Sequence, residues 1–236
     1  MKPLALLSVF AAALAGGTVT NLPGADEVVA AMMEHDNARQ SALGGYTGLR
    51  RYVLENARHH KRAEMLVRVT CARDGSKQFE MVSSTGWGGA RKYVFGRLLD
   101  AESEASRPGA RDQSRVTPEN YWFEMAGRDQ VDGRDAYVLN VAPKEPKKYL
   151  FRGKIWVDAE EYAIVRIAGA PAKNPSFWVK SVHFAHTYEK HGLFWFPASN
   201  DSVTDVRIFG STELRIDYFD YQPNSLPVSI AGDLSE

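Results

Sequence analysis

The sequence predicts a mainly β (α+β) fold, in which one N-terminal helix covers a single curved antiparallel sheet of about eleven strands. Three observations lead to this prediction. Apolar residues follow helical spacing in one stretch near the N-terminus, and from residue 45 onward apolar and polar residues alternate instead. Turn signals separate these alternating runs, which is typical of strands that follow one another as hairpins and therefore pair antiparallel.

The helix is expected over residues 26–43. Pro23-Gly24 precedes it, Asp26 can cap its first turn, and Gly44-Gly45 can end it. Its apolar side chains cluster on one side, and these are Val28, Val29, Met32 and Met33. An apolar stripe of this kind needs a surface to lie against, and the open mouth of a curved sheet offers one.

The strands show a period of two. Residues 63–71 form the first clear run, and the dipeptides Asp74-Gly75 and Asp132-Gly133 are hairpin turns. Two later runs, residues 176–190 and 193–208, are long. Long strands are more typical of strongly curved sheets or barrels than of small sandwiches.

One polar stretch interrupts the strands. Residues 100–118 contain Arg107-Pro108-Gly109, which predicts a mobile loop, with a short helix around residues 101–106. The loop and the N-terminal helix are the two segments that we expect to move.

The N-terminus indicates export. Lys2 is followed by an apolar run over residues 4–14 and by the small-x-small pattern Ala13-Leu14-Ala15, as in a signal peptide. A membrane anchor or a hydrophobic first helix are the alternatives, but the run is shorter than the ~20 residues of a membrane span. No cysteine follows this region that could carry a lipid. We therefore expect a periplasmic protein that is not itself lipidated.

Three segments follow from these signals. We expect a signal peptide over residues 1–20, one β-rich domain over residues 24–221, and a flexible tail over residues 222–236. The charges balance, with 29 Lys+Arg and 29 Asp+Glu. A neutral balance argues against nucleic acid as a partner and against a polybasic membrane-binding patch.

Enzyme motifs are absent from the sequence. It has no glycine-rich phosphate loop, no Gly-x-Ser-x-Gly elbow and no His-Glu-x-x-His motif. The single cysteine, Cys71, shares a strand face with two valines, so a buried thiol is favoured over a reactive one. We predict that the protein is not an enzyme and uses no cofactor.

The histidines do not predict a metal site. His183 and His186 have opposite parity on a strand and should point to opposite faces of the sheet. His59 and His60 fall at a hairpin corner, and His191 falls in a turn. A hydrolase that uses His183 or His191 with a nearby acid is kept only as a third functional hypothesis.

Aromatic residues are clustered at Tyr121-Trp122-Phe123 and Phe194-Trp195-Phe196. Ordinary sheet packing explains such clusters, because aromatics favour strands. The alternative is that they line or rim an apolar cavity.

Two local motifs lie in the middle of the chain, at residues 133–144 (Gly-Arg-Asp-Ala-Tyr-Val-Leu-Asn-Val-Ala-Pro-Lys) and 153–158 (Gly-Lys-Ile-Trp-Val-Asp). With the order of signal peptide, helix and long meander, they resemble the outer-membrane lipoprotein-sorting family, the LolA/RseB-like periplasmic carriers. The resemblance covers roughly residues 25–221 and implies a half-closed antiparallel barrel whose N-terminal helix is a lid over an apolar cavity.

The resemblance implies a carrier for lipoprotein acyl chains or another lipid, and we expect the protein to be a monomer. The alternative is a periplasmic sensor or regulator that binds an envelope protein partner. Lipoprotein carriers of this family use an arginine to hold the lid shut, and Arg50 or Arg51 are the nearest candidates for that role here. We assign Val28, Met32 and Arg51 to the lid. The expected cavity lining is the apolar face of the strands, which consists of Met65, Val67, Val69, Phe79, Met81, Tyr137, Leu139, Ile155 and Val157.

Overall fold

The computed structural model describes residues 22–90, 94–174, 179–207 and 210–225. In these residues ten strands form one antiparallel sheet, in the order β3-β2-β1-β10-β9-β8-β7-β6-β5-β4. The strands are β1 (Leu43–Asn56), β2 (Lys61–Cys71), β3 (Lys77–Gly86), β4 (Tyr121–Val131), β5 (Arg134–Pro143), β6 (Phe151–Asp158), β7 (Ile164–Pro171), β8 (Val179–His191), β9 (Phe194–Val206) and β10 (Gly210–Ser225). Apart from the pairing of β1 with β10, the paired strands are neighbours in sequence, as hairpin succession predicts.

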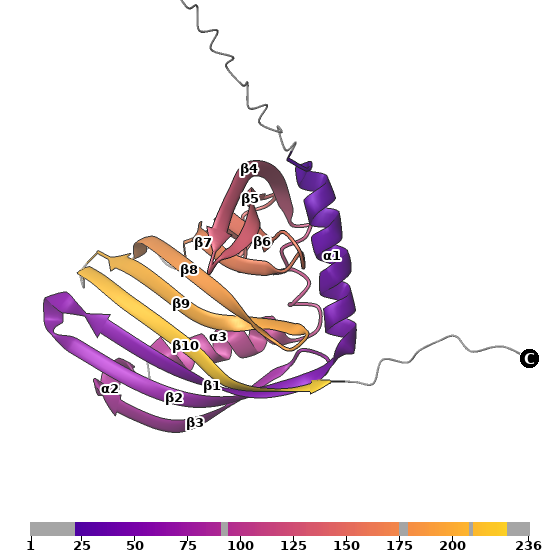
Figure 1. Ribbon diagram of the computed structural model, residues 1–236. Helices are drawn as coiled ribbons and strands as arrows, with labels where there is room; N and C mark the ends of the chain where they lie inside the picture. The colour runs from indigo at the N-terminus through magenta and orange to yellow at the C-terminus, as the bar shows by residue number, and fades with distance from the viewer. Residues whose placement is uncertain (1–21, 91–93, 175–178, 208–209, 226–236) are drawn as a thin grey trace, which may run out of the picture.

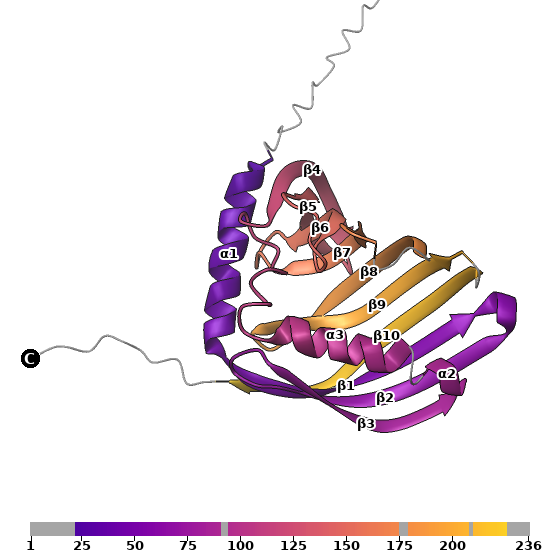
Figure 2. The same cartoon turned by 180° about the vertical axis from the view of Figure 1, so that it is seen from behind.

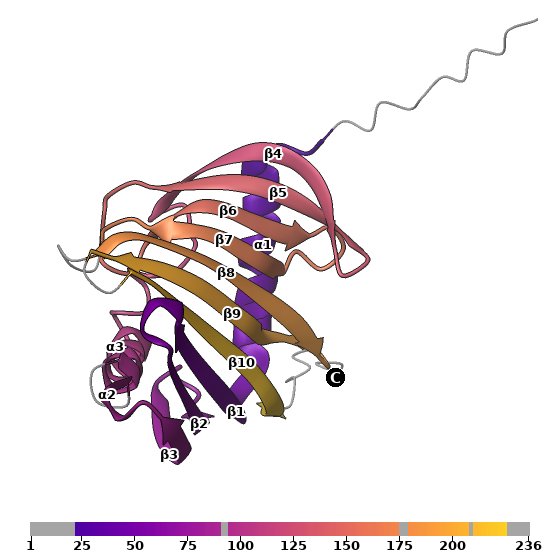
Figure 3. The ribbon, with the colours of Figure 1, turned by 90° about the vertical axis from the view of Figure 1, so that its left-hand side faces the viewer.

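The sheet curves into half a barrel. It arches from β4 at one edge to β3 at the other, and these two edge strands do not pair (Figure 3). Register shifts interrupt the pairing of β1 with β10, β2 with β3, β4 with β5, β6 with β7 and β8 with β9. Such bulges bend strands and increase their twist. The predicted fold class is confirmed, with ten described strands in place of about eleven.

The helix α1 (Ala25–Ala42) crosses the open side of the sheet, from the β4 edge to β1 (Figure 1). Its start corrects one expectation, because Gly24, in an extended conformation, is the N-cap and Asp26 lies in the first turn. The Asp26 carboxylate can still favour the positive end of the helix dipole there. Gly45 lies in β1 with a φ of 117°, where an added Cβ would lie 2.5 Å from the Cys71 carbonyl oxygen.

A second helix, α3 (Gly96–Ser106), lies on the concave side of the sheet near β1, β2 and β3 (Figure 2). The predicted short helix around residues 101–106 is confirmed, but it begins earlier because Leu98 and Leu99 pack on the core. The short helices η1 (Ala57–His59) and α2 (Gly88–Ala90) complete the described helices. Part of the polar stretch predicted as a loop therefore forms packed structure.

The concave face carries two apolar cores. The first joins Val28, Val29 and Met32 of α1 to strands β4 to β7. The second lies between α3 and the strands β1, β2, β3 and β10. A smaller cluster around Val138 and Trp156 lies on the opposite, convex face. Each helix therefore covers one end of the concave face.

The last strand runs further than the sequence indicated. β10 ends at Ser225, although the tail was expected to begin at residue 222. Beyond Asp217, β10 pairs with β1 alone among the described strands. Pro223, opposite Tyr46, is tolerated there because no second partner strand needs its missing N–H group. Residues 226–236 and the expected signal peptide, residues 1–20, lie outside the described residues.

Candidate functional site

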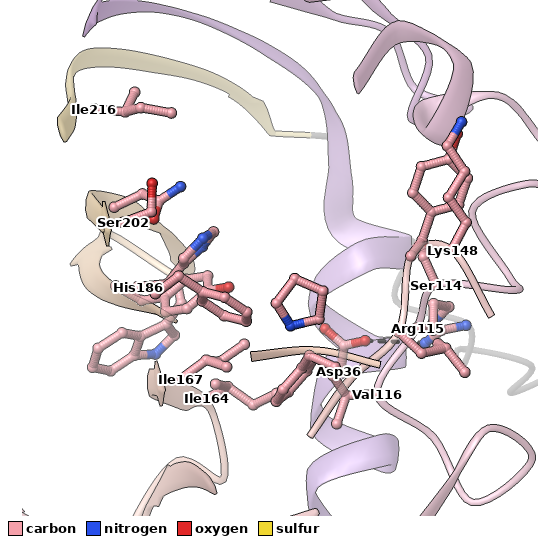
Figure 4. A pocket seen from close by; sticks show the side chains of 18 of the residues that line it. Asp36, Ser114, Arg115, Val116, Lys148, Ile164, Ile167, His186, Ser202 and Ile216 are labelled. Atoms are coloured by element: carbon pink, nitrogen blue, oxygen red, sulfur yellow. Dashed lines mark hydrogen bonds and ion pairs between the residues drawn. The ribbon is translucent and has the colours of Figure 1, made fainter. Parts of the chain in front are cut away.

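Between the two apolar cores the concave face is not filled. A cavity of about 620 Å³ lies here, bounded by α1, by the inner face of β7 to β10 and by the end of α3. Figure 4 shows Ile164, Ile167 and His186 of the sheet on one side of it and Arg115 and Lys148 on the other. We call this space the central cavity.

The strands supply its wall by simple alternation. Val182, Phe184, His186 and Tyr188 are successive inward positions of β8. Ile167 of β7 and the β10 residues Leu214 and Ile216 extend the apolar surface, and Met32 and Met33 of α1 face it. Methionine side chains are flexible and adapt to ligands of varied shape.

Among the polar side chains of this wall, two lie side by side. His186 and Asn200 are direct partners in the register of β8 and β9. Burial lowers the pKa of His186 to about 4, so the imidazole is neutral at pH 7. The side-chain oxygen of Asn200 is buried and has no hydrogen-bond partner among the described residues. The pair can therefore receive a neutral polar group of a ligand.

A second cavity, of about 350 Å³, continues from the first beneath α3. Both share the lining residues Leu98, His186, Tyr188, Asn200 and Ile216. The rest of its wall consists of the charged residues Arg50, Lys77 and Glu102 together with Tyr52, Pro197 and Tyr218. We call this space the polar cavity.

Arg50, Lys77 and Glu102 form a bridged ion triad in the polar cavity. Nη1 of Arg50 donates to Oε2 of Glu102 at 2.6 Å, and Nζ of Lys77 donates to Oε1 at 2.8 Å. Burial by itself raises the pKa of the Glu102 carboxyl, but Lys77 and Arg50 outweigh it and lower the pKa to about 2. The carboxylate is therefore ionised at neutral pH, and α3 is tied to β1 and β3 by charge.

Arg50 is held from its flanks as well. Its guanidinium carbon lies 4.9 Å from the ring centre of Tyr218 and 5.5 Å from that of Phe79. The side chain is only 4% exposed. Both rings lie close enough to the guanidinium to stabilise its positive charge by cation–π interaction.

Polar contacts hold the C-terminal half of α1 at the rim of the central cavity. Nη2 of Arg115 donates to Asp36 at 3.0 Å and to Asn37 at 3.2 Å (Figure 4, Asp36 and Arg115). Nη2 of Arg111 donates to Gln40 at 2.7 Å. The N-terminal half of the helix instead buries Val28 and Val29 in the first core. The two halves are thus attached by different kinds of interaction.

The structure places the sequence-predicted lining residues in the two cores flanking the cavities. Tyr137, Leu139, Ile155 and Val157 pack with the helix residues Val28 and Met32. Met65, Val67 and Val69 pack beneath α3, with Phe79 partly buried beside them. Met81, on the edge strand β3, is 51% exposed. Of the residues assigned to the cavity lining or the lid from sequence, Met32 lines the central cavity.

The two candidate arginines lie on opposite faces of β1. Arg51 is exposed on the convex face and pairs with Glu64 there, at 2.7 Å. Arg50 is the one that faces the cavities and bonds to α3. Strand parity placed Arg50 with the buried Tyr52 and Leu54, and this signal could have selected it.

The histidines and the cysteine that the sequence singled out differ in their surroundings. His183 is exposed whereas His186 is inward, so the two histidines do face opposite ways. Cys71 is buried, and burial raises the pKa of its thiol. Among the described residues no group of His, Cys, Asp and Glu has the arrangement of a metal site. Within the same residues, no helix is both long and apolar enough to cross a membrane.

Comparison with known protein families gives one match. The model of the MucB/RseB N-terminal domain matches residues 64–172, just under half of the chain, from β2 to β7. Both motifs that carried the resemblance lie inside this range, so the resemblance is confirmed. No curated protein matches the chain.

Several solved structures are similar at low identity. A putative outer-membrane lipoprotein-sorting protein domain from Vibrio parahaemolyticus is 14% identical with a TM-score of 0.45, covering 85% of this chain and 93% of that one. A LolA superfamily protein from Nitrosomonas europaea is 10% identical with a TM-score of 0.41, covering 87% and 96%. The MucA/MucB complex from Pseudomonas aeruginosa is 11% identical with a TM-score of 0.28, and the match covers 83% of this chain and 99% of that one. Scores this low assign no function to this chain.

Proposed function

We propose that this chain is an exported, periplasmic binding protein that carries the acyl chain of a lipoprotein or another lipid in the central cavity. The observation that supports the proposal is the unfilled apolar space between α1 and the sheet. Protein interiors are normally close-packed, so an unfilled, mainly apolar space of this size between two apolar cores is the expected place for an apolar ligand.

The size and chemistry of the cavity agree with such a ligand. Its volume of about 620 Å³ lies within the range of ~300–1,000 Å³ that is usual for small-molecule sites. Burial gains about 0.8 kcal/mol per methylene, so a chain of ~16 carbons would gain on the order of 10 kcal/mol before ordering costs. This is enough for a carrier, which must also release its cargo.

The proposed lid is the C-terminal half of α1. Polar rim contacts of Asp36, Asn37 and Gln40 hold it, whereas Val28 and Val29 anchor the other half in the first core. Water can replace hydrogen bonds at an exposed rim at little cost, but it cannot replace buried apolar contacts. Opening would therefore begin at the rim and uncover Met32 and Met33.

The first experiment is native mass spectrometry, with lipid extraction, on protein purified from a periplasm. The expected result is a discrete added mass identified as a lipid or an acylated peptide. A fluorescent fatty-acid probe then measures binding to delipidated protein. An unliganded mass together with no probe binding would contradict the carrier proposal.

A matched pair of variants localises the binding. Val182→Trp on β8 should fill the central cavity and weaken probe binding. Val203→Trp is the control, because Val203 on β9 is 42% exposed and is not among the cavity lining. Equal loss of binding in both variants would place the probe elsewhere.

A second candidate is a regulator that binds an envelope protein through the same fold. The match to the MucB/RseB N-terminal domain favours it, since a MucB protein has been solved in complex with MucA. Under this alternative the purified protein should carry a protein partner and no lipid. Cross-linking in intact cells followed by mass spectrometry distinguishes it from the carrier.

A further inference from the structure

We infer that the polar cavity is an anion site, that Glu102 of α3 occupies it in the free protein, and that the ligand carries an acidic head group that binds Arg50 and Lys77. The inference rests on the proposed function and adds the chemical class of the ligand. The apolar central cavity accounts for the acyl chain of the ligand, and this inference concerns its polar head group.

The charges of the polar cavity do not balance. Among the described residues that line it, the charged groups at neutral pH are Arg50, Lys77 and Glu102, two cations and one anion. His186 adds no charge, because burial lowers its pKa to about 4. A buried surplus of positive charge is costly unless an anion can neutralise it.

The hydrogen-bond donors are also in surplus. A guanidinium has five N–H groups and an ammonium has three, whereas Glu102 accepts one hydrogen bond from each cation. The Tyr218 and Phe79 rings keep the guanidinium of Arg50 beside the cavity. A carboxylate or phosphate is the group that a fixed arginine with a neighbouring lysine recognises best.

Glu102 is placed to be exchanged. It comes from α3, which lies on the concave face as a separate element, and its side chain is 32% exposed, against 4% for Arg50. Leu98, one helical turn earlier, lines both cavities, so movement of α3 would change both at once. An incoming acid would take the place of Glu102 on the two cations and loosen α3.

The lining of the two connected cavities changes from apolar to charged, as a ligand with an apolar tail and a polar head requires. The apolar wall of Val182, Phe184 and Ile167 leads to the neutral pair His186 and Asn200, and then to Arg50. Asn200 offers an unpartnered buried acceptor at the junction. An acyl chain, a hydroxyl or amide N–H, and an acidic group would meet matching surfaces in this order.

The test compares three probes with the same chain, hexadecanoate, hexadecyl phosphate and hexadecanol, each displacing the fluorescent probe. The wild-type protein should bind one or both acids more tightly than the alcohol. A preference for one acid identifies the head group as a carboxylate or a phosphate.

Two variants change the site in opposite directions. Glu102→Gln removes the resident anion and should strengthen acid binding roughly tenfold relative to the alcohol, as one charge-assisted hydrogen bond would. Lys77→Gln removes one cation and should reduce the preference for the acids. Asp100→Asn is the control, because Asp100 is exposed on the same helix and lines neither cavity.

The outcomes separate the two proposals. If none of the three probes binds the wild-type protein, the proposed function fails. If all three bind with equal affinity, and neither Glu102→Gln nor Lys77→Gln changes their ratio, the carrier stands and the anion site is overturned. If Glu102→Gln strengthens acids and alcohol equally, Glu102 is only a latch on α3 and the anion site is again overturned.

Discussion

Arg134 and Asp158 form a two-pronged ion pair that joins the two sequence motifs of the central hairpins. Nε of Arg134 donates to Oδ2 of Asp158 at 2.6 Å, and Nη2 donates to Oδ1 at 3.0 Å. Asp158 is 1% exposed and also accepts from the backbone N–H groups of Glu160 and Glu161. Neither residue lines the central or the polar cavity. We therefore assign the two motifs a structural role, which is to hold the turn between β6 and β7.

The first prediction concerns this pair. Arg134→Ala leaves the buried Asp158 carboxylate without its cation and should lower the free energy of unfolding by about 1.5–3 kcal/mol, the usual range for hydrogen bonds to charged groups. Urea denaturation measures the change. Arg62→Ala is the control, because its ion pair with Glu55 is exposed and should contribute less than about 1 kcal/mol. Similar losses in the two variants would contradict a special role for Arg134.

The second prediction concerns Gly153, which begins the second motif. A Cβ there would lie 2.0 Å from the carbonyl oxygen of Ala168, on the neighbouring strand β7. Gly153→Ala should therefore push β6 and β7 apart and destabilise the protein by at least about 1–3 kcal/mol. Gly88→Ala is the control, since a Cβ at Gly88 meets nothing within 4 Å. Thermal unfolding of both variants checks this, and an unchanged melting temperature for Gly153→Ala would show that the strands adapt.

The third prediction tests the proposed lid. Arg115→Ala removes the hydrogen bonds to Asp36 and Asn37 that hold the C-terminal half of α1. Amide hydrogen exchange of residues 36–42 should become roughly tenfold faster, as the loss of about 1.4 kcal/mol of local stability implies. Exchange around Val28 and Val29 should not change, because these residues are anchored in the first core. Uniform acceleration along α1 would mean that the helix opens as one unit.

The sequence predicted the sheet well because strand alternation is a local property. The opposite orientations of His183 and His186, the Asp132-Gly133 turn with φ angles of 50° and 78°, and the apolar stripe of α1 all follow from neighbours in sequence. The concave face could be identified in this way.

The cavities could not be located by the same reasoning. Alternation marks Leu139 and Phe184 alike as inward, but only tertiary packing decides that α1 covers the first and leaves the second beside an open space. The bond between Arg50 and Glu102 joins residues 52 positions apart and depends on how α3 lies on the sheet. Periodicity carries no information on such a pairing.

The last prediction is a dependence of stability on pH that comes from His186. Burial lowers the pKa of this imidazole to about 4, whereas in the unfolded chain it is about 6.5. Between these two values the unfolded state binds more protons than the folded state, so stability falls as the pH is lowered from about 6.5 to about 4. The loss attributable to His186 should approach roughly 3 kcal/mol at the acid end of this window.

His186→Phe should flatten the pH profile of the urea midpoint over this range, while His183→Phe, at an exposed position, should leave the slope unchanged. A wild-type slope retained in His186→Phe would mean that the imidazole remains hydrated in the folded protein. Glu102, whose pKa is lowered to about 2, contributes stability at higher pH that is lost only as the pH falls from about 4.5 toward 2, so the two effects can be separated.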